Sequence, residues 1–393
     1  MRFPGFKGEW EIKKLGTLMD FKVTNSFSRE NLNYENGTIR NIHYGDIHTK
    51  FQTLFNITRE SVPFINKGMP TGRINEDNYC QEGDMVFADA SEDLNDIGKS
   101  IEIIDLNKER LLSGLHTLLA RPKRGIFHLG FNGYLFKSNS VRRQIQKEAQ
   151  GTKVLSINVG RISKIELGYP TIPEQQKITT ILTLIDERIQ TQSKIIERLE
   201  SLMQGLREQL FTQKLRFKDG DGNDFPNWQV KKLGEIATKK ASNISANSLA
   251  ENTGVYKIYG ATGILKNIDF YNEEEEYVSI VKDGAGVGRL FLCEAKTSVL
   301  GTLDVIKNTK FSNLKFLYYK LSTINFSKYT AGSTIPHIYF KDYSNENIEV
   351  PSLNEQAIIA NLLFSIDGKI EAEKQILEQY ERQKKYLLAN LFI

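Results

Sequence analysis

The residues from Arg40 to Lys50 carry the side chains best suited to chemistry, in the order RNIHYGDIHTK. Their histidine, tyrosine, aspartate and lysine side chains all end in hydrogen-bonding groups. On a loop, such groups contact base edges or phosphates of a nucleic acid. Ordinary surface decoration explains the composition equally well, so both interpretations stay open. The analogous stretch in the second half of the chain is YKIYGATGILK, residues 256–266.

A glycine-rich stretch, Asp283–Arg289 (DGAGVGR), resembles a nucleotide-binding loop. That motif should follow a strand and open a helix. A strand is predicted before it, but Leu290-Phe-Leu-Cys predicts a second strand after it. A tight turn is therefore favoured over a cofactor loop. Its glycines would still let backbone N–H groups approach phosphates, with Lys282 and Arg289 at its ends.

Basic and hydroxyl-bearing segments add further candidate contacts. Arg121-Pro-Lys-Arg124 and Arg142-Arg143 suit phosphates, although a solvated face is the simpler explanation. Thr330–His337 (TAGSTIPH) could contact a nucleic-acid backbone. The residues for which we predict a nucleic-acid contact are His43, Tyr44, Asp46, His48, Lys50, Arg121, Lys123, Arg124, Tyr259, Thr262, Lys266, Lys282, Arg289, Ser333, Thr334 and His337.

Other chemistries lack their residues. The five histidines offer no metal-ligand spacing beyond His43 and His48, and two cysteines make neither a disulfide framework nor a cysteine-based zinc site. The stretch Lys218–Asp224 imitates the start of an EF-hand, but Asp224 and Val230 stand where glycine and glutamate are needed. An adenine methyltransferase needs a catalytic loop with two adjacent prolines, and the sequence has no such pair. We expect no metal, cofactor or catalytic site.

The amino-acid composition restricts the possible partners and location of the protein only broadly. The chain has 393 residues, 40% hydrophobic and 25% charged, with a net charge of +4. That charge permits a nucleic-acid partner without demanding one. The N-terminal MRFPGFKGEW has no apolar core of a signal peptide, and no run of 18 apolar residues occurs. We therefore expect a cytoplasmic protein that does not enter a membrane.

Two long helices must position these candidate segments. Residues 173–211 and 354–392 align without a gap at an offset of 181, pairing Pro170 with Pro351 and Glu174-Gln175 with Glu355-Gln356. Apolar residues recur in steps of four and three, which is a heptad pattern interrupted by Gln192, Glu373 and Lys384. The predicted seam of this helix pair contains Ile178, Leu182, Ile185, Ile189, Ile196, Leu199, Leu206, Ile359, Leu363, Ile366, Ile370, Leu377 and Leu387.

The repeat also includes the globular parts. Trp10 opens the motif WEIKKLG and Trp228 opens WQVKKLG, here at an offset of 218, so the second globular part is shorter by 37 residues. Between these edges the two parts match only weakly, for example at Gly151-Thr-Lys and Gly332-Ser-Thr. Strands are predicted at Gly83–Ala88 and Glu276–Val281, and a helix within Phe311–Leu321.

We therefore predict an α+β protein with an internal pseudo-twofold repeat, in which a pair of long antiparallel coiled-coil helices separates two α/β domains. The expected division is a first recognition domain over 1–172, a helix over 173–215, a second recognition domain over 216–350 and a helix over 351–393. A rod of roughly 57 Å follows from about 38 residues at 1.5 Å each. Such a helix pair would fix the spacing of two different readers on one DNA duplex, where half-sites recur about every 34 Å.

The duplicated order of motifs resembles the specificity (S) subunit of type I restriction–modification systems. The residues that carry this resemblance are Trp10 with Leu15-Gly16, Trp228 with Leu233-Gly234, Pro170 through Gln175, Pro351 through Gln356, and Gly332-Ser333-Thr334. The match covers essentially the whole chain. Residues Gly151–Val154 and Ser163–Glu166 follow the family pattern less well than their counterparts.

The resemblance implies a non-catalytic subunit whose two domains each read one half of a bipartite site in double-stranded DNA. It implies two methyltransferase (M) subunits docked on the helices, and restriction (R) subunits that join through M. S-adenosylmethionine, ATP and Mg would then belong to those partners, and the assembly would be an adenine-N6 methyltransferase and ATP-dependent endonuclease. Two alternatives stay open: a helical scaffold carrying two protein-binding domains, and a self-sufficient DNA methyltransferase.

Overall fold

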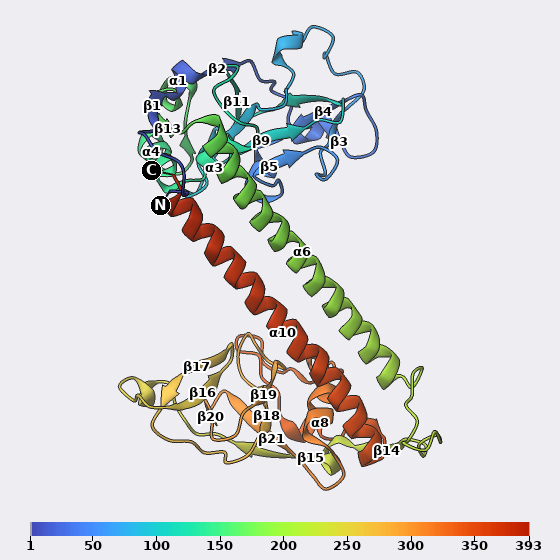
Figure 1. The fold of residues 1–393 in the computed structure, drawn as a ribbon. Helices are drawn as coiled ribbons and strands as arrows, with labels where there is room; N and C mark the ends of the chain where they lie inside the picture. The colour runs from blue at the N-terminus through green and yellow to red at the C-terminus, as the bar shows by residue number, and fades with distance from the viewer. Residues whose placement is uncertain (1, 393) are drawn as a thin grey trace. The chain divides into compact units, whose positions relative to one another are not determined.

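The computed structural model describes residues 2–392 and is an α+β protein with two compact units (Figure 1). Unit 1 contains the chain up to Gln192 and the segment from Ile376 onward, and unit 2 is Ser193–Gln375. The long helices α6 (Ile172–Phe211) and α10 (Leu353–Asn390) each contribute to both units. The prediction of two long helices is confirmed within a residue or two at their starts.

Unit 1 is built on a five-stranded sheet in the order β2-β11-β7-β9-β5 and a four-stranded sheet in the order β10-β4-β6-β3. Two short ribbons, β1-β13 and β12-β8, complete it. Its strands are β1 (Glu11–Lys14), β2 (Met19–Lys22), β3 (Leu32–Asn33), β4 (Ile39–Ile42), β5 (Leu54–Asn56), β6 (Phe64–Ile65), β7 (Met85–Ala88), β8 (Ala90–Ser91), β9 (Ser100–Asp105), β10 (Arg110–Ser113), β11 (Thr117–Pro122), β12 (Leu155–Ser156) and β13 (Glu166–Tyr169). Its shorter helices are α1 (Leu15–Leu18), α2 (Tyr44–Thr49), α3 (Phe131–Leu135), α4 (Asn139–Glu148) and α5 (Val159–Ile162), with 3₁₀ turns η1 (Arg29–Asn31) and η2 (Glu76–Asn78).

Unit 2 has a four-stranded sheet in the order β15-β21-β18-β19, a three-stranded sheet in the order β17-β16-β20, and the ribbon β14-β22. Its strands are β14 (Gln229–Lys232), β15 (Ala237–Ala241), β16 (Tyr256–Gly260), β17 (Gly263–Ile268), β18 (Tyr277–Val281), β19 (Leu290–Cys293), β20 (Ser298–Val299), β21 (Leu303–Asn308) and β22 (Asn347–Val350). Its shorter helices are α7 (Leu233–Ile236), α8 (Leu314–Leu321) and α9 (Phe340–Tyr343), with 3₁₀ turns η3 (Asn247–Leu249) and η4 (Phe326–Tyr329). The strands predicted at Gly83–Ala88 and Glu276–Val281 and the helix predicted within Phe311–Leu321 are all present.

The two units share more than their edges. Strands β2-β11-β7-β9 of unit 1 and β15-β21-β18-β19 of unit 2 have the same spatial order and the same order along the chain. The strands β10-β4-β6 and β20-β16-β17 correspond in the same way. Between β4 and β6, however, unit 1 inserts residues 43–63, whereas β16 and β17 are joined by residues 261–262 alone. The sequence hid this likeness because short strands tolerate many apolar substitutions.

The predicted seam lies inside the structure. Ile178, Leu182 and Ile185 of α6 pack in the core of unit 1 together with Leu387 of α10. In unit 2, seam residues of both long helices likewise pack in the core. Five seam residues are half-buried and the others are buried; the half-buried ones are Ile189, Leu199, Leu206, Ile366 and Leu377. The helices are antiparallel, because Lys384 pairs with Asp186 at 2.5 Å in unit 1 while Lys374 pairs with Glu200 at 2.7 Å in unit 2.

The paired Gln175 and Gln356 explain why a glutamine recurs at the start of each long helix. Both side chains are fully buried. Gln175 donates to the carbonyls of Pro170 (2.8 Å) and Ile126 (3.0 Å) and accepts the His128 N–H at 2.8 Å. Gln356 makes the same three bonds in unit 2, to the carbonyls of Pro351 and Phe311 and from the Asn313 N–H. Each glutamine thereby ties its helix start to the loop that precedes α3 or α8.

Charged and aromatic contacts repeat in the same places. The buried Glu174 binds Arg2 through both oxygens, and the buried Glu355 binds Arg216 in the same way. In unit 1 the Tyr134 hydroxyl donates to Asp186 at 2.9 Å; in unit 2 the Tyr319 hydroxyl donates to Asp367 at 2.5 Å.

In each unit, an aromatic residue at the end of a long helix also packs in the core. Phe392, which follows α10, packs on Phe131 with ring centroids 5.7 Å apart, and Phe211 at the end of α6 packs on Phe316 at 5.8 Å. The core of unit 1 therefore includes the last described residue of the chain.

Candidate nucleic-acid interface

Four loops of unit 1 meet at one end of its main sheet. They are the insertion that begins with α2, the β7–β9 connection, the β10–β11 turn and the loop that follows α4. The Asp89 N–H donates to the His116 carbonyl at 3.0 Å, the His48 ring nitrogen lies 3.1 Å from the Ala90 carbonyl, and Leu155 pairs with Ser91. Such loops at the end of a rigid sheet are where binding residues collect.

Tyr44 lies at the centre of this end, among three histidines. Its ring centroid is 4.7 Å from that of His43, 5.4 Å from His116 and 6.1 Å from His48. His116 also contacts the Asp89 carboxylate at 3.2 Å, and burial raises the pKa of Asp89. His43 is buried, Tyr44 and His48 are half-buried and His116 is exposed, so solvent reaches this cluster chiefly at Tyr44 and His116.

The start of α2 explains how these side chains are held. His43 is the N-cap, because its ring nitrogen accepts the Gly45 N–H at 3.1 Å. Burial, followed by the charge of Arg29, lowers the pKa of His43, which favours the neutral ring that this bond requires. Asp46 is fully buried and binds Arg29 at 2.7 Å and Lys50 at 3.0 Å. Asp46 therefore positions the two cations, and a base contact by its own carboxylate stays a prediction.

The same four loops meet in unit 2. The Lys282 N–H donates to the Thr302 carbonyl at 2.9 Å, as Asp89 does to His116 in unit 1. The Gly284 N–H donates to the Pro336 carbonyl at 2.8 Å, and Arg289 donates to the Ala261 carbonyl at 2.7 Å. The structure thus brings together the predicted segments that contain Thr262, Lys282–Arg289 and Ser333–His337.

The predicted residues of unit 2 divide into two groups. Thr262, Arg289, Ser333 and Thr334 are exposed and His337 is half-buried at this end of the unit. The other three are engaged within the protein. Burial raises the pKa of Tyr259 to about 12, Lys266 donates to the Leu249 carbonyl at 2.7 Å, and Lys282 pairs with Asp304 at 3.2 Å.

The glycine-rich stretch is a turn, as the sequence favours. Strand β18 ends at Val281 and pairs antiparallel with β19, which begins at Leu290, so no helix follows the glycines. The arrangement lacks the helix N-terminus on which a nucleotide-binding loop places its phosphates.

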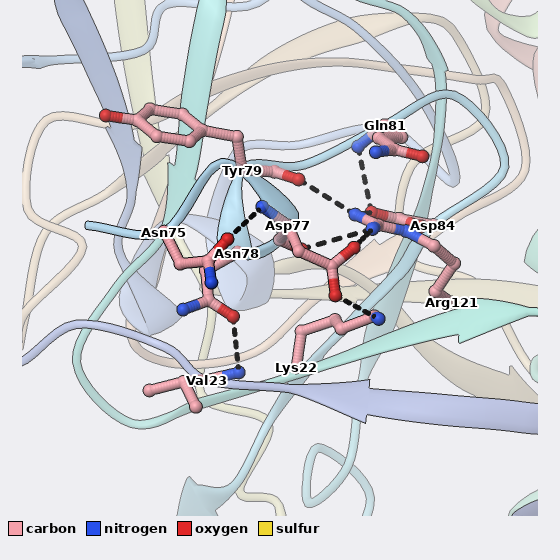
Figure 2. A network of polar contacts seen from close by, with 9 residues as sticks. All are labelled: Lys22, Val23, Asn75, Asp77, Asn78, Tyr79, Gln81, Asp84 and Arg121. Atoms are coloured by element: carbon pink, nitrogen blue, oxygen red, sulfur yellow. Dashed lines mark hydrogen bonds and ion pairs between the residues drawn. The ribbon is translucent and has the colours of Figure 1, made fainter.

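Arg121, predicted to contact DNA, is instead engaged in a network within unit 1 (Figure 2). Its guanidinium makes two bonds to Asp84 at 2.9 and 2.8 Å, two to Asp77 and one to the Tyr79 carbonyl at 2.8 Å. These bonds use all five donors of an arginine. Lys22 pairs with Asp77 at 2.6 Å on the other side of that carboxylate. A DNA contact by Arg121 stays a prediction, with no free donor to support it.

Lys123 and Arg124 lie beyond this network and are exposed. They line a hollow of about 300 Å³ together with Arg121, Glu82 and Asp84. Strand β11 runs from Thr117 to Pro122, so this hollow lies at the opposite end of β11 from His116 and the four loops. The structure therefore does not join the Arg121–Arg124 segment with the His43–Lys50 segment.

Replacing Arg121 by methionine is expected to lower the free energy of unfolding by about 3 kcal/mol, because it leaves the buried Asp84 without its cation. Burial already raises the pKa of Asp84, and the loss of Arg121 raises it further. When folding raises the pKa of a carboxyl group, the protein loses stability as the pH rises from the unfolded-state pKa up through the raised, folded-state pKa. The defect should therefore be larger at about pH 8 than at about pH 4 in denaturant titrations.

Arg124→Met is the matched control, since residues 2–392 provide no ion pair for that exposed side chain. It should leave stability unchanged at both pH values. A variant at Arg121 that keeps full stability but loses affinity for DNA would contradict the structural role and restore the predicted contact.

Several residues of the site escape sequence reasoning. Asp84, Asp77 and Arg29 carry the charges that hold Arg121 and Asp46, yet they lie 37, 44 and 17 positions from those residues. Asp89 pairs with a histidine 27 positions away. No local pattern marks such partners.

Among residues 2–392, no group of three or more histidine, cysteine, aspartate or glutamate side chains is placed to hold a metal ion. None of the described helices is both long and apolar enough to span a membrane. Both thiols, Cys80 and Cys293, are free and buried.

Comparison with known families gives a match over most of the chain. Residues 7–201 and 226–382 each match the type I restriction modification DNA specificity domain. The boundaries of the two matches follow the internal repeat, since each runs from a globular part into the long helix that follows it.

Individual relatives agree with this match. The chain is 29% identical to a putative type I restriction enzyme specificity subunit, MjaX, of Methanocaldococcus jannaschii over 78% of this chain and 76% of that protein. It is 27% identical to the MjaVIII specificity subunit of the same organism, over 74% and 75% of the two chains. Its fold is similar to the crystal structure of a type I restriction–modification S subunit from M. genitalium, with a TM-score of 0.68, 16% identity and coverage of 100% and 99%.

Proposed function

The chain belongs to the type I restriction modification DNA specificity family, and on that premise we propose that it selects the DNA sequence on which a restriction–modification complex acts. Each unit reads one half of a split, asymmetric site through its four-loop end. The chain is a specificity subunit and its family is non-catalytic; methyl transfer and cleavage belong to other subunits.

The observation that carries this proposal is that the two units share one backbone architecture but differ in the side chains at their four-loop ends. Both units have the same strand order, the same glutamine bonds and the same four loops at one end. The side chains at those ends differ: Tyr44 with three histidines in unit 1, Thr262 and Arg289 in unit 2. Two readers of unlike half-sites need this arrangement, because base edges are distinguished by the side chains that reach them.

The recognition domains extend over 1–172 and 216–350 in this proposal, and the helices over 173–215 and 351–393 set their spacing on the duplex. Two M subunits dock on the helices, and R subunits join through M. In this proposal the partner subunits bind S-adenosylmethionine, ATP and Mg, and the assembly is an adenine-N6 methyltransferase and ATP-dependent endonuclease. Support comes from the family; in addition, a chain of similar fold, with a TM-score of 0.54 and 16% identity, comes from a structure whose description concerns complex assembly of the type I R-M system.

The decisive experiment is to map methylated adenines in the genome of cells that carry the chain with its M subunit and of cells in which this chain alone is deleted. We expect one split motif that disappears with the chain. If no split motif depends on the chain, the proposed function is wrong. Methyl transfer by the isolated chain would favour a self-sufficient methyltransferase instead.

A further inference from the structure

The two units share one small element that is exposed in both. We call it the tip loop: Gly151–Val154 in unit 1 and Gly332–Ile335 in unit 2. Gln150 exchanges both backbone hydrogen bonds with Ser156, and Ala331 exchanges both with His337. These pairs are related by the same offset of 181 that relates the long helices, so the loop was duplicated together with the frame.

The shape of the tip loop depends on its glycine. Gly151 has φ of +123° and Gly332 has φ of +88°, values that side-chain-bearing residues rarely adopt. A Cβ at Gly151 would lie 2.1 Å from the Val154 carbonyl oxygen, and a Cβ at Gly332 would lie 2.4 Å from the Ile335 carbonyl oxygen. Both units therefore keep the same tight geometry, although only the glycine is identical between the two tips.

The chemistry of the tips suits an anion. All eight residues are exposed. Residues 2–392 give no hydrogen-bond acceptor or ion pair to the side chains of Thr152, Lys153, Ser333 or Thr334. The seven-residue segments 150–156 and 331–337 contain no acidic residue. Hydroxyls, amines and exposed backbone N–H groups are the usual partners of DNA phosphates.

Because the tip loop occurs in both units, its ligand should be a feature that both half-sites share. The two half-sites of a split sequence differ in their bases, and the loops around the tips differ accordingly. What both half-sites share is the sugar–phosphate backbone. Resting on the proposed function, we propose that the tip loops bind this backbone in each half-site, fix the register of each unit on the duplex and take no part in choosing the bases.

The repeat supplies the test, because Lys153 in the first tip corresponds to Thr334 in the second. Lys153→Thr and Thr334→Lys each install a residue that the other tip already holds, so folding should be preserved. The measurement is the affinity of the complex between this chain and M for DNA that contains the motif it methylates, over a range of salt concentrations. One phosphate contact changes the slope of log affinity against log salt by about 0.9. We expect Lys153→Thr to make the slope shallower by about that amount and Thr334→Lys to make it steeper, with the same motif methylated.

Lys218→Thr, on the exposed connection between α6 and β14, is the matched control and should leave the slope unchanged. Unchanged slopes in both tip variants would overturn the inference. A changed base at either half-site would also overturn the inference, because the tip loops would then read bases. Weaker assembly with M at an unchanged slope would overturn it too, because the tip loops would then contact protein. Failure of the proposed function itself would be seen earlier, since the unaltered complex would then show no sequence-specific DNA binding.

Discussion

Gln175→Ala is expected to destabilise unit 1 by about 3–6 kcal/mol, because it removes one buried and two part-buried hydrogen bonds, and each backbone group left unsatisfied costs about 1–3 kcal/mol, least where solvent reaches it. The groups are the carbonyls of Pro170 and Ile126 and the N–H of His128. Few water molecules can replace the amide, since Gln175 is fully buried. A loss of this size is a large fraction of the stability of a typical domain, roughly 5–15 kcal/mol.

Native-state hydrogen exchange is the appropriate measurement, because a chain of two units need not unfold in one step. Amides of unit 1 should exchange faster in Gln175→Ala while those of unit 2 keep their protection, and Gln356→Ala should give the opposite result. Gln176→Ala is the control: its side chain is exposed, and Ala357 occupies the corresponding position of the repeat. Equal effects of Gln175→Ala and Gln176→Ala would refute the importance of the buried amide.

Exchanging the reading part of unit 2 should replace one half of the methylated motif completely. The segment from β15 to β21, Ala237–Asn308, contains three of the four loops but leaves Asn313, Phe316 and Tyr319 to contact α6 and α10. We expect a chain that carries this segment from a family member of different specificity to modify a hybrid motif. The half-site read by unit 1 should be unchanged.

The reciprocal exchange in unit 1, from β2 to β11, is the control for position and should alter only the other half-site. Both motifs are read by mapping methylated adenines in cells. A chimera that assembles with M but changes both half-sites would show that the units do not read independently. One that keeps both half-sites would place the base contacts outside the exchanged segment, and the fourth loop, after η4, would be the next to test.

Much of the frame could be predicted because it is periodic or duplicated. The heptads and the offset of 181 locate α6 and α10, and the predicted seam residues are buried or half-buried as expected. The recurrence of Glu-Gln indicates the start of each helix. What the two residues bind could not be predicted, because Arg2 lies 172 positions from Glu174 and His128 lies 47 positions from Gln175.

The candidate interface was predictable only in part. Side-chain type identifies Tyr44 and Arg289 as residues able to contact a nucleic acid. It does not reveal that Asp46 is buried beneath Arg29 or that Arg121 is saturated by Asp84 and Asp77, since both depend on loops that meet only in the folded chain. The correspondence of the 43–63 insertion to a two-residue turn also needed the strand order, because the inserted residues have no counterpart to align.

The discontinuous sequence of unit 1 has a consequence for the order in which the two units fold. Its core holds Leu387, Leu391 and Phe392 together with Trp10 and residues of the first sheet. Folding of unit 1 must therefore bring together two segments that unit 2 separates in the sequence, whereas Ser193–Gln375 is contiguous, and closing a longer loop costs more conformational entropy. Domains usually fold in order from the N-terminus, but here unit 2 should fold before unit 1, and deleting residues 387–392 should leave the N-terminal part exposed to proteases.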